Sequence, residues 1–405
     1  MYTQVSKIEQ SFSVAFADFV RGKEREGRRI IKMQTGDPDF PTHPVIVNTA
    51  HQAMLAGETK YCDSRGLLSL REGLSEKLLS VNSIQASPQE NILVTQGAVH
   101  GIAIAVRALV NPGDEVIILE PFWRAYEANV ILAGGTPVIV QTDPQIGFQL
   151  DAERVLECIT SKTKAIIINT PNNPSGAVYK ESELLRLAVG AANRGVYLIS
   201  DEVYESLTFG ESRHFSAASN PDVFNFTLSA FSFSKSHAMT GWRIGYLVAN
   251  KSLIDECLKL SQFSITSLPP FSQEAALTAL TDARAIAYSR HMRVEYEARR
   301  NHIAARIKDT WLNSAMMLPN GTFYALIDVS HFGYGSLELA KKIVDVGCVS
   351  LTPGIAFGDG MDGYLRMCFA TSLENIDAAL EVLIQFEKTN YENRNHCGDS
   401  PRLRR

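Results

Sequence analysis

The sequence lacks any clustering of its cysteines. Its 405 residues include only six, and none of them lies in a C-x-x-C pair. They are Cys62, Cys158, Cys257, Cys348, Cys368 and Cys397. Such wide spacing is unlike a disulfide framework or a zinc site and is typical of reduced thiols that pack as small apolar side chains. The sequence therefore predicts neither disulfide bonds nor a metal centre.

Long hydrophobic runs and charge clusters are also missing. No stretch reaches the roughly 18 apolar residues of a membrane helix, and the first residues, "MYTQVSKIEQSFSV", lack the apolar core of a signal peptide. Lysine and arginine are scattered, and the formal net charge is -5. This charge pattern excludes an electrostatic footprint for nucleic acid or a membrane surface. We expect a cytoplasmic protein that binds neither nucleic acid nor a membrane.

What the sequence does contain is a series of short apolar runs rich in β-branched residues, separated by longer amphipathic stretches. The runs are "NILVTQG", "EVIILEP", "TPVIVQT", "KAIIINTP", "VYLISDE" and "FTLSAFS". Short runs bounded by turn residues are typical of buried parallel strands that alternate with helices. The pattern predicts a large, doubly wound α/β domain over residues 50–285.

A smaller domain is expected after a long helix. The segment "DARAIAYSRHMRVEYEARRNHIAARIKDTW" contains neither glycine nor proline. Beyond it, "GTFYALIDV" and "DGYLRMCFA" are predicted strands, and "SLELAKKIVDVG" and "ENIDAALEVLIQFEKT" are predicted helices. We assign residues 1–49 and 286–390 to this α+β domain and expect the polar residues 391–405 to be a disordered tail.

Chemically distinctive residues follow the predicted strands. Ligands of open parallel sheets bind beyond the carboxyl ends of the strands. The residues in these positions are Gly97, Trp123, Asn173, Asp201, Tyr204 and Lys235. Taken singly, each has an ordinary explanation: a turn, a core ring, a loop, a helix cap or a surface lysine. Together they combine a helix N-terminus, a stacking ring, a carboxylate, a phenol and an amine, which indicates one binding site.

Six blocks in preserved order resemble the class I/II aminotransferases, which depend on pyridoxal phosphate. They are "TGDPDFPTHP", "KYCDSRGLLSLREGL", "PNNPSGAVY", "SDEVYE", "SFSKSHAMTGWRIGY" and "YLRMCFATS". The resemblance implies an α/β fold-type I transferase with pyridoxal 5'-phosphate as its cofactor. It also implies a role in amino acid metabolism, namely transfer of the amino group of an L-amino acid to a 2-oxo acid by a ping-pong mechanism.

The resemblance also implies roles for individual residues. Lys235 would bind the cofactor covalently and carry the substrate proton, Asp201 would pair with the ring nitrogen, and Tyr204 would bond the ring oxygen. The other cofactor-binding residues would be Gly97, Ala98, Val99, Trp123, Asn173, Ser232, Arg243 and Tyr61. The substrate would contact Gly36, Trp123, Asn173 and Arg366. Because Tyr61 in this family reaches the phosphate of a neighbouring subunit, a homodimer is implied. Without the resemblance, Arg366 would be a surface ion-pair residue and Tyr61 an ordinary half-buried tyrosine.

Substrate choice is less constrained by these motifs. Aspartate-preferring bacterial relatives often carry a lysine at the position of Val99, and the segment "SFSVAFADFVRG" is rich in phenylalanine. We therefore expect a neutral or aromatic donor, with aspartate next, although packing of an amphipathic helix explains the same phenylalanines. Two other classes stay open: a lyase, decarboxylase or synthase with the same cofactor, and a non-enzymatic regulator that retains the fold.

Overall fold

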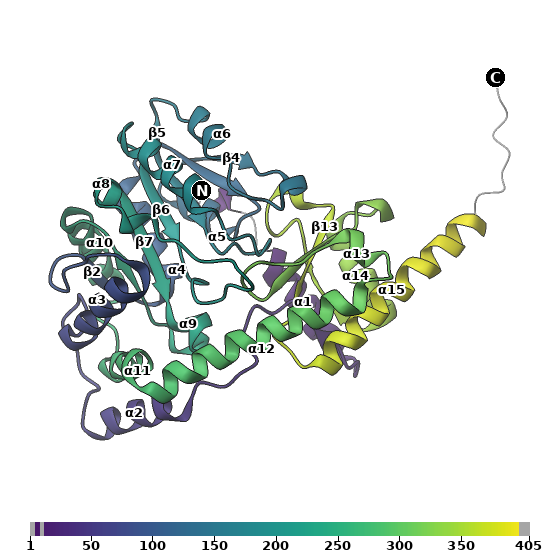
Figure 1. Ribbon diagram of the computed structural model, residues 1–405, viewed down its shortest axis with the longest axis horizontal. Coiled ribbons are helices and arrows are strands. Elements are labelled where there is room, and N and C mark those ends of the chain that lie inside the picture. Colours follow the sequence, from purple (N-terminus) through teal and green to yellow (C-terminus); the bar gives the residue numbers. More distant parts are fainter. Residues whose placement is uncertain (1–4, 9–11, 397–405) are drawn as a thin grey trace. The chain divides into compact units, whose positions relative to one another are not determined.

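The computed structural model describes residues 5–8 and 12–396, which form two compact units. The first unit contains residues 5–8, Asp37–Glu295 and Pro319–Thr322. The second contains residues 12–36, Tyr296–Leu318 and 323–396. The expected long helix is α12, Ala283–Ile307, which begins in the first unit and ends in the second (Figure 1).

A seven-stranded sheet in the order β2-β8-β7-β6-β5-β3-β4 forms the centre of the first unit. Its strands are β2 (Ile92–Thr95), β3 (Glu115–Glu120), β4 (Thr136–Gln141), β5 (Thr163–Asn169), β6 (Tyr197–Asp201), β7 (Thr227–Ser232) and β8 (Gly245–Val248). All six expected runs are strands. The added strand β8 is antiparallel to both β2 and β7, whereas β4, β3, β5, β6 and β7 pair in parallel. The prediction of a mostly parallel, doubly wound α/β sheet is confirmed.

Both faces of this sheet are covered by helices, as its continuous apolar strands require. One face packs on α4 (Gly97–Leu109), α5 (Ala125–Leu132) and α10 (Lys251–Ser264). The other face packs on α3 (Leu68–Asn82), α6 (Ala152–Glu157), α7 (Glu181–Ala192), α8 (Pro221–Phe224) and α11 (Pro270–Thr281). Side chains alternate between the faces along a strand. In β6, for example, Ile199 belongs to the first core and Leu198 to the second.

The boundary between the units differs from the predicted one. Residues 37–49 were assigned to the smaller domain, but α2 (Pro44–Leu55) belongs to the first unit. Its Ile46 and Ala50 are buried in one apolar cluster with Leu74 of α3 and Ala276 of α11. The sequence does not show that residues 37–49 belong to this unit, because one of the two helices that complete the core around α2, α11, lies more than 200 positions away.

The second unit contains a four-stranded sheet in the order β12-β13-β10-β9, and a parallel pair, β1 with β11. The strands are β1 (Ile31–Lys32), β9 (Met316–Met317), β10 (Tyr324–Asp328), β11 (Val349–Ser350), β12 (Thr352–Pro353) and β13 (Tyr364–Cys368). The helices are α1 (Phe12–Arg25), α13 (Leu312–Ala315), α14 (Ser336–Gly347) and α15 (Leu373–His396). Both expected strands and both expected helices are present, so this unit is α+β.

Helix α15 also changes the expectation for the C-terminus. Residues 391–396 were predicted to be disordered but continue this helix, whereas 397–405, including Cys397, lie outside the described residues. The other five cysteines are free thiols. Within the described ranges, no helix is long and apolar enough to cross a membrane, and no group of acidic, cysteine or histidine side chains is arranged to hold a metal ion.

Candidate active site

Asp201 is the last residue of β6 and lies at the carboxyl end of the sheet. Only 3% of it is exposed, and its Oδ2 accepts a hydrogen bond of 2.5 Å from the Tyr126 hydroxyl of α5. The amide of Val203 donates to its Oδ1 at 3.2 Å. Burial raises the pKa of Asp201 to about 6, although these hydrogen bonds and the charge of Lys235 act in the opposite direction. The site thus holds a buried carboxyl group whose pKa lies closer to neutral pH than that of an exposed aspartate, and a positive partner would favour its ionised form.

Lys235 is close enough to Asp201 for its charge to lower the pKa of that carboxyl group. It is half-buried in α9 (Phe233–Ser236), the short helix that follows β7 directly. The Ser232 side chain caps this helix by accepting from the amide of Ser234 at 3.1 Å. The prediction that Lys235 and Asp201 meet at one edge of the sheet agrees with this arrangement, because β6 and β7 are adjacent and parallel.

A cradle of backbone and guanidinium groups lies where α4 begins. Gly97 has a φ of +73°, and a Cβ added there would stand 2.8 Å from Nη2 of Arg243. A Cβ on Gly245 would stand 2.9 Å from the amide nitrogen of Ala98. The N-cap residue Gln96 makes no side-chain capping bond. The first turn of α4 therefore presents amide donors beside an arginine, which is a suitable arrangement for an anion such as a phosphate.

The loop after β5 is tied to the end of β6. Asn169 donates to the carbonyl oxygen of Asp201 at 3.0 Å and accepts from the amide of Asn173 at 2.8 Å. Trp123, just after β3, packs edge-on against the ring of Tyr126 with centroids 5.7 Å apart. Tyr204 is 4% exposed, and burial, Asp201 and, to a smaller extent, Tyr204 raise the pKa of Tyr126. We call this group (Trp123, Tyr126, Asn173, Asp201, Tyr204 and Lys235) the sheet-edge cluster.

Arg366 is placed in the second unit, in the central strand β13. It is 6% exposed, so the alternative of a surface ion pair is wrong. Its guanidinium carbon lies 4.1 Å from the ring centroid of Tyr324 and 4.9 Å from that of Phe357. Nη2 donates to the Gln34 carbonyl at 2.7 Å and to the Thr352 hydroxyl at 3.1 Å. A buried guanidinium oriented in this way is suited to bind a carboxylate.

Gly36 is adjacent to the same aromatic ring, because a Cβ on it would collide with the Tyr324 hydroxyl. The structure therefore brings Gly36 and Arg366, both predicted to bind substrate, together around Tyr324. Two other predicted residues stand in solvent: Tyr61 is 85% exposed and Val99 is 42% exposed. Neither is part of the sheet-edge cluster in a single chain.

Three aromatic residues of these sites were missed from the sequence. Tyr126 lies three residues after Trp123 in the stretch "EPFWRAY", a spacing that could have indicated a contact between the two rings. Tyr324 and Phe357 carried no signal, because only pairing of the strands and loops of the second unit places them beside Arg366. His237, two residues after Lys235, is assigned no role in the chemistry, and burial and the charge of Lys77 lower its pKa to about 4.

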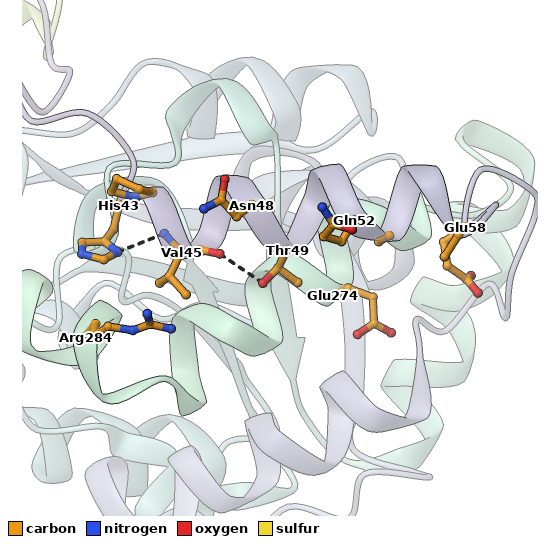
Figure 2. A pocket seen from close by; sticks show the side chains of 11 residues that line it. His43, Val45, Asn48, Thr49, Gln52, Glu58, Glu274 and Arg284 are labelled. Atoms are coloured by element: carbon orange, nitrogen blue, oxygen red, sulfur yellow. Dashed lines mark hydrogen bonds between the residues drawn. The ribbon is translucent and has the colours of Figure 1, made fainter.

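A polar groove elsewhere on the first unit contains no residue of the sheet-edge cluster. Its volume is about 740 Å³, and it runs along α2 (Figure 2). Asn48 and Gln52 of α2 line it together with Glu274 of α11 and Arg284 of α12. These residues match none of the predicted catalytic, cofactor or substrate positions.

Comparison with known families decides what kind of protein contains these sites. The family described as aminotransferase class I and II matches residues 28–383. The chain belongs to this family. Enzymes of the family depend on pyridoxal phosphate and act on amino acids and 2-oxo acids. The expected transaminase is therefore confirmed, and neither a lyase, decarboxylase or synthase nor a non-enzymatic regulator is favoured.

Individual relatives of this aminotransferase cover nearly all of its length. It is 37% identical to an aspartate/prephenate aminotransferase of Thermus thermophilus over 93% of this chain and 96% of that protein. It is 36% identical to aromatic-amino-acid aminotransferase 2 of Thermococcus litoralis over 87% and 90%. The solved structure of the Thermus thermophilus aspartate aminotransferase with maleate has a TM-score of 0.90 at 36% identity, over 95% of this chain and 99% of that one. These matches confirm the predicted fold-type I architecture.

Proposed function

We propose that this aminotransferase binds pyridoxal 5'-phosphate covalently at Lys235 and uses it to pass an amino group from an L-amino acid to a 2-oxo acid. The observation that carries the proposal is the meeting of Lys235 with a buried carboxyl group, Asp201, at the ends of two adjacent parallel strands. An aldehyde cofactor needs an amine to bind to, and its ring nitrogen needs an acid beside it. Both groups are present at this edge of the sheet.

The cradle at the start of α4 fits the phosphate group of this cofactor. The amides of Ala98 and Val99 would donate to its oxygens, and the guanidinium of Arg243 would supply a planar pair of donors. Ser232 would add a hydroxyl. Gly97 supports this assignment, because Nη2 of Arg243 lies against its backbone and its φ of +73° favours glycine.

Asp201, Tyr204 and Lys235 would divide the chemistry between them. When bound, the cofactor ring withdraws electrons from the substrate α-carbon. Asp201 would hold a proton on the ring nitrogen, because a neighbouring cation favours the ionised carboxylate despite its burial. Tyr204 and Asn173 would hydrogen-bond the ring oxygen, and Trp123 would cover the ring. Nζ of Lys235, once released by the substrate, would take the α-proton of the amino donor. In the second half-reaction it would give a proton to the α-carbon of the acceptor.

Arg366 would bind the α-carboxylate of the amino acid, assisted by the backbone of Gly36. The stacking of its guanidinium between Tyr324 and Phe357 supports this role, because it fixes the orientation of the two-pronged donor before substrate arrives. A substrate carboxylate would also supply the charge that this buried cation requires.

For the donor side chain, we propose a neutral or aromatic amino acid, with aspartate as the next candidate. The relatives include enzymes named for aspartate, prephenate and aromatic amino acids, so the family permits both classes. Val99 in the first turn of α4 offers no charge to a second carboxylate, which favours the neutral class. A panel of amino donors against 2-oxoglutarate, pyruvate and oxaloacetate, read as kcat/KM for each pair, decides between them.

We also propose that the enzyme is a homodimer in which Tyr61 reaches the phosphate of the neighbouring subunit. Two aromatic side chains support an interface: Tyr61 is 85% exposed and Phe263 is 95% exposed. Both rings are therefore accessible to a second copy of the chain. Light scattering on purified protein should give twice the mass of the chain, and a monomer at micromolar concentration would contradict the proposal.

Cofactor binding itself is tested with purified protein. Addition of pyridoxal 5'-phosphate should produce a visible absorption band, and borohydride reduction followed by peptide mapping should locate the attached group on Lys235. A protein that stays colourless, or a label on another lysine, would overturn the proposal. Pyruvate and ammonia, or carbon dioxide, formed without a 2-oxo acid acceptor would indicate a lyase or decarboxylase instead.

A further inference from the structure

A buried polar network lies directly behind the residues that would work on the cofactor. It consists of Glu202, Glu205, Lys77, Asn82, His214 and Ser216, and we call it the carboxylate network. Its two acids, Glu202 and Glu205, flank Tyr204 in the chain, yet neither has a role in the chemistry described above. Glu202 is fully buried, and only 15% of the Glu205 side chain is exposed.

Each carboxylate of the network is held by several donors. Glu202 Oε2 lies 2.7 Å from Nε2 of His214 and also accepts from the Ser216 hydroxyl. Glu205 accepts from Nζ of Lys77 and, at 2.7 Å, from Nδ2 of Asn82. The same Asn82 nitrogen donates to Ser216 at 2.9 Å, which joins the two halves. The network is therefore continuous from α3 to the segment around residue 214.

The alternation of side chains explains why the network and the sheet-edge cluster lie on opposite faces. Asp201 has the parity of Ile199, whose face of the sheet is covered by α4 and α5, and it contacts Tyr126 of α5. Glu202 has the opposite parity, and its network leads to α3 on the other face. The turn from Asp201 to Glu205 is thus held by hydrogen bonds to residues on both faces of the sheet, Tyr126 of α5 on one and Asn82 of α3 on the other.

Lys77 also connects the network to the strand that precedes Lys235. Its ammonium lies 4.6 Å from the ring centroid of Phe231, in β7, and donates to Asn82 at 2.8 Å. Its positive charge contributes to the low pKa of His237. One partly buried cation therefore contacts both the turn that carries Tyr204 and the strand that leads to Lys235.

Stability alone does not account for such a network. Burial of two carboxylates and an ammonium removes their hydration, and a buried ion pair seldom stabilises a fold more than apolar residues of the same volume. What well-bonded buried charges do supply is a fixed backbone and fixed side-chain directions. The residue held between the two acids is Tyr204, which is itself 4% exposed.

We propose that the carboxylate network positions Tyr204 and Asp201 for their work on the bound cofactor, with Glu205 and Lys77 as its positioning residues. The inference rests on the proposed function of the sheet-edge cluster. Neither Glu205 nor Lys77 exchanges a proton with the substrate. Their effect is exerted through the direction of the Tyr204 hydroxyl and through the backbone of the turn, which begins with the amide of Glu202 donating to the Ala230 carbonyl at 2.9 Å.

The test uses the holoenzyme with Glu205→Gln, which keeps the size and an acceptor for Asn82 but removes the ion pair with Lys77. We expect kcat to fall about tenfold with KM within about twofold, since a misplaced catalytic group costs up to about a hundredfold. The pH midpoint of the bound cofactor's absorption should rise, because a displaced Tyr204 leaves the ring oxygen and the attached nitrogen more basic. Equilibrium dialysis should show weaker binding of pyridoxal 5'-phosphate.

Substitutions of Lys77 test the other member of the ion pair, and one of them should restore the wild-type properties. Lys77→Gln should reproduce the changes of Glu205→Gln, the double variant should be no worse than either single variant, and Lys77→Arg should restore both midpoint and kcat. These comparisons decide the matter even if Glu205→Gln fails to fold. Glu338→Gln is the matched control, because it removes an exposed ion pair with Lys342 on α14 and should leave every readout unchanged.

Two outcomes would contradict different parts of the argument. If the variants lose thermal stability while the absorption midpoint, kcat and cofactor affinity stay at wild-type values, the network is merely structural and this inference is wrong. If the wild-type protein itself forms no absorption band with the cofactor, the proposed function fails instead. A loss of activity that Lys77→Arg does not restore would also contradict a positioning role for this pair.

Discussion

Asp201 in the first unit and Arg366 in the second are both buried ionisable groups, yet their surroundings differ in kind. Asp201 accepts hydrogen bonds from Tyr126 and Val203, and burial nevertheless raises its pKa to about 6. Arg366 lies between two aromatic rings and donates to neutral oxygens. The first environment brings the pKa of a carboxyl group closer to neutral pH, whereas the second keeps a fixed positive charge ready for an anion. The comparison suggests that the sheet-edge cluster governs turnover and that the Arg366 site governs recognition.

The largest effect should come from removal of the Lys235 amine from the sheet-edge cluster. Lys235→Ala should lower kcat by at least about a thousandfold, because both the nucleophile and the proton carrier are lost. The cofactor should still bind noncovalently through the cradle at α4. Steady-state kinetics and absorption spectra provide the measurement, with Lys251→Ala on the exposed surface of α10 as control. Substantial remaining turnover would contradict the assignment of Lys235.

Loss of the buried Arg366 guanidinium should impair recognition of the substrate carboxylate in the second unit. Arg366→Leu should lower kcat/KM by about a hundredfold, since hydrogen bonds to charged groups contribute about 1.5–3 kcal/mol. Most of the loss should appear as a higher KM for amino acids and 2-oxo acids, while cofactor affinity stays the same. Arg306→Leu, which breaks an exposed ion pair with Asp377, is the control in the same unit. Unchanged kinetics would move the carboxylate site elsewhere.

The charge state of Asp201 can be tested through stability. Because its pKa is raised in the fold, the folded apo protein holds the proton more tightly, so its stability falls as pH rises from about 4 to 6. Asp201→Asn removes this dependence and should stabilise the apo protein at pH 7.5 by about 3 kcal/mol, while it weakens activity. Chemical unfolding of apo protein at pH 4 and pH 7.5 provides the measurement.

Asp282 supplies the control of opposite sign. A hydrogen bond and ion pair with Arg284 lower its pKa to about 2, so its contribution to stability is present above pH 4 and is lost as pH falls toward 2. Asp282→Asn should therefore leave the apo protein no more stable at pH 7.5. An Asp201→Asn protein that is less stable than wild type at this pH would show that the ionised carboxyl group of Asp201 does not destabilise the folded apo protein.

The smallest effect should come from Tyr126→Phe. Loss of the hydroxyl removes a hydrogen bond that lowers the Asp201 pKa, so that pKa should rise further and the acid limb of kcat against pH should move to higher pH. The decrease in kcat at neutral pH should be up to about tenfold, as expected for a hydrogen bond to a charged group. Tyr197→Phe, at the other end of β6, should change neither limb.

The parts that could be predicted from sequence are those with a local signal. Six of the seven strands of the large sheet appear as apolar runs between turn residues, and Lys235, Asp201 and Asn173 follow such runs directly. Strand β8 was missed because "GYLV" is short and overlaps the end of "SFSKSHAMTGWRIGY", a block that was interpreted only as part of the site. Residues 37–49 were assigned to the wrong unit because one of the two helices that bury them, α11, is more than 200 positions away in the sequence.

The sequence by itself determined the order of elements and the residue types at the strand ends, since local periodicity and turn chemistry do not depend on distant contacts. Only the tertiary structure decided which side chains share an environment. It buried Arg366 between two rings, joined Tyr126 to Asp201 and enclosed Glu202 and Glu205 in one network. Burial and pairing depend on atoms brought together from separate parts of the chain. They set the pKa of a carboxyl group and the direction of a donor, and no linear pattern encodes them.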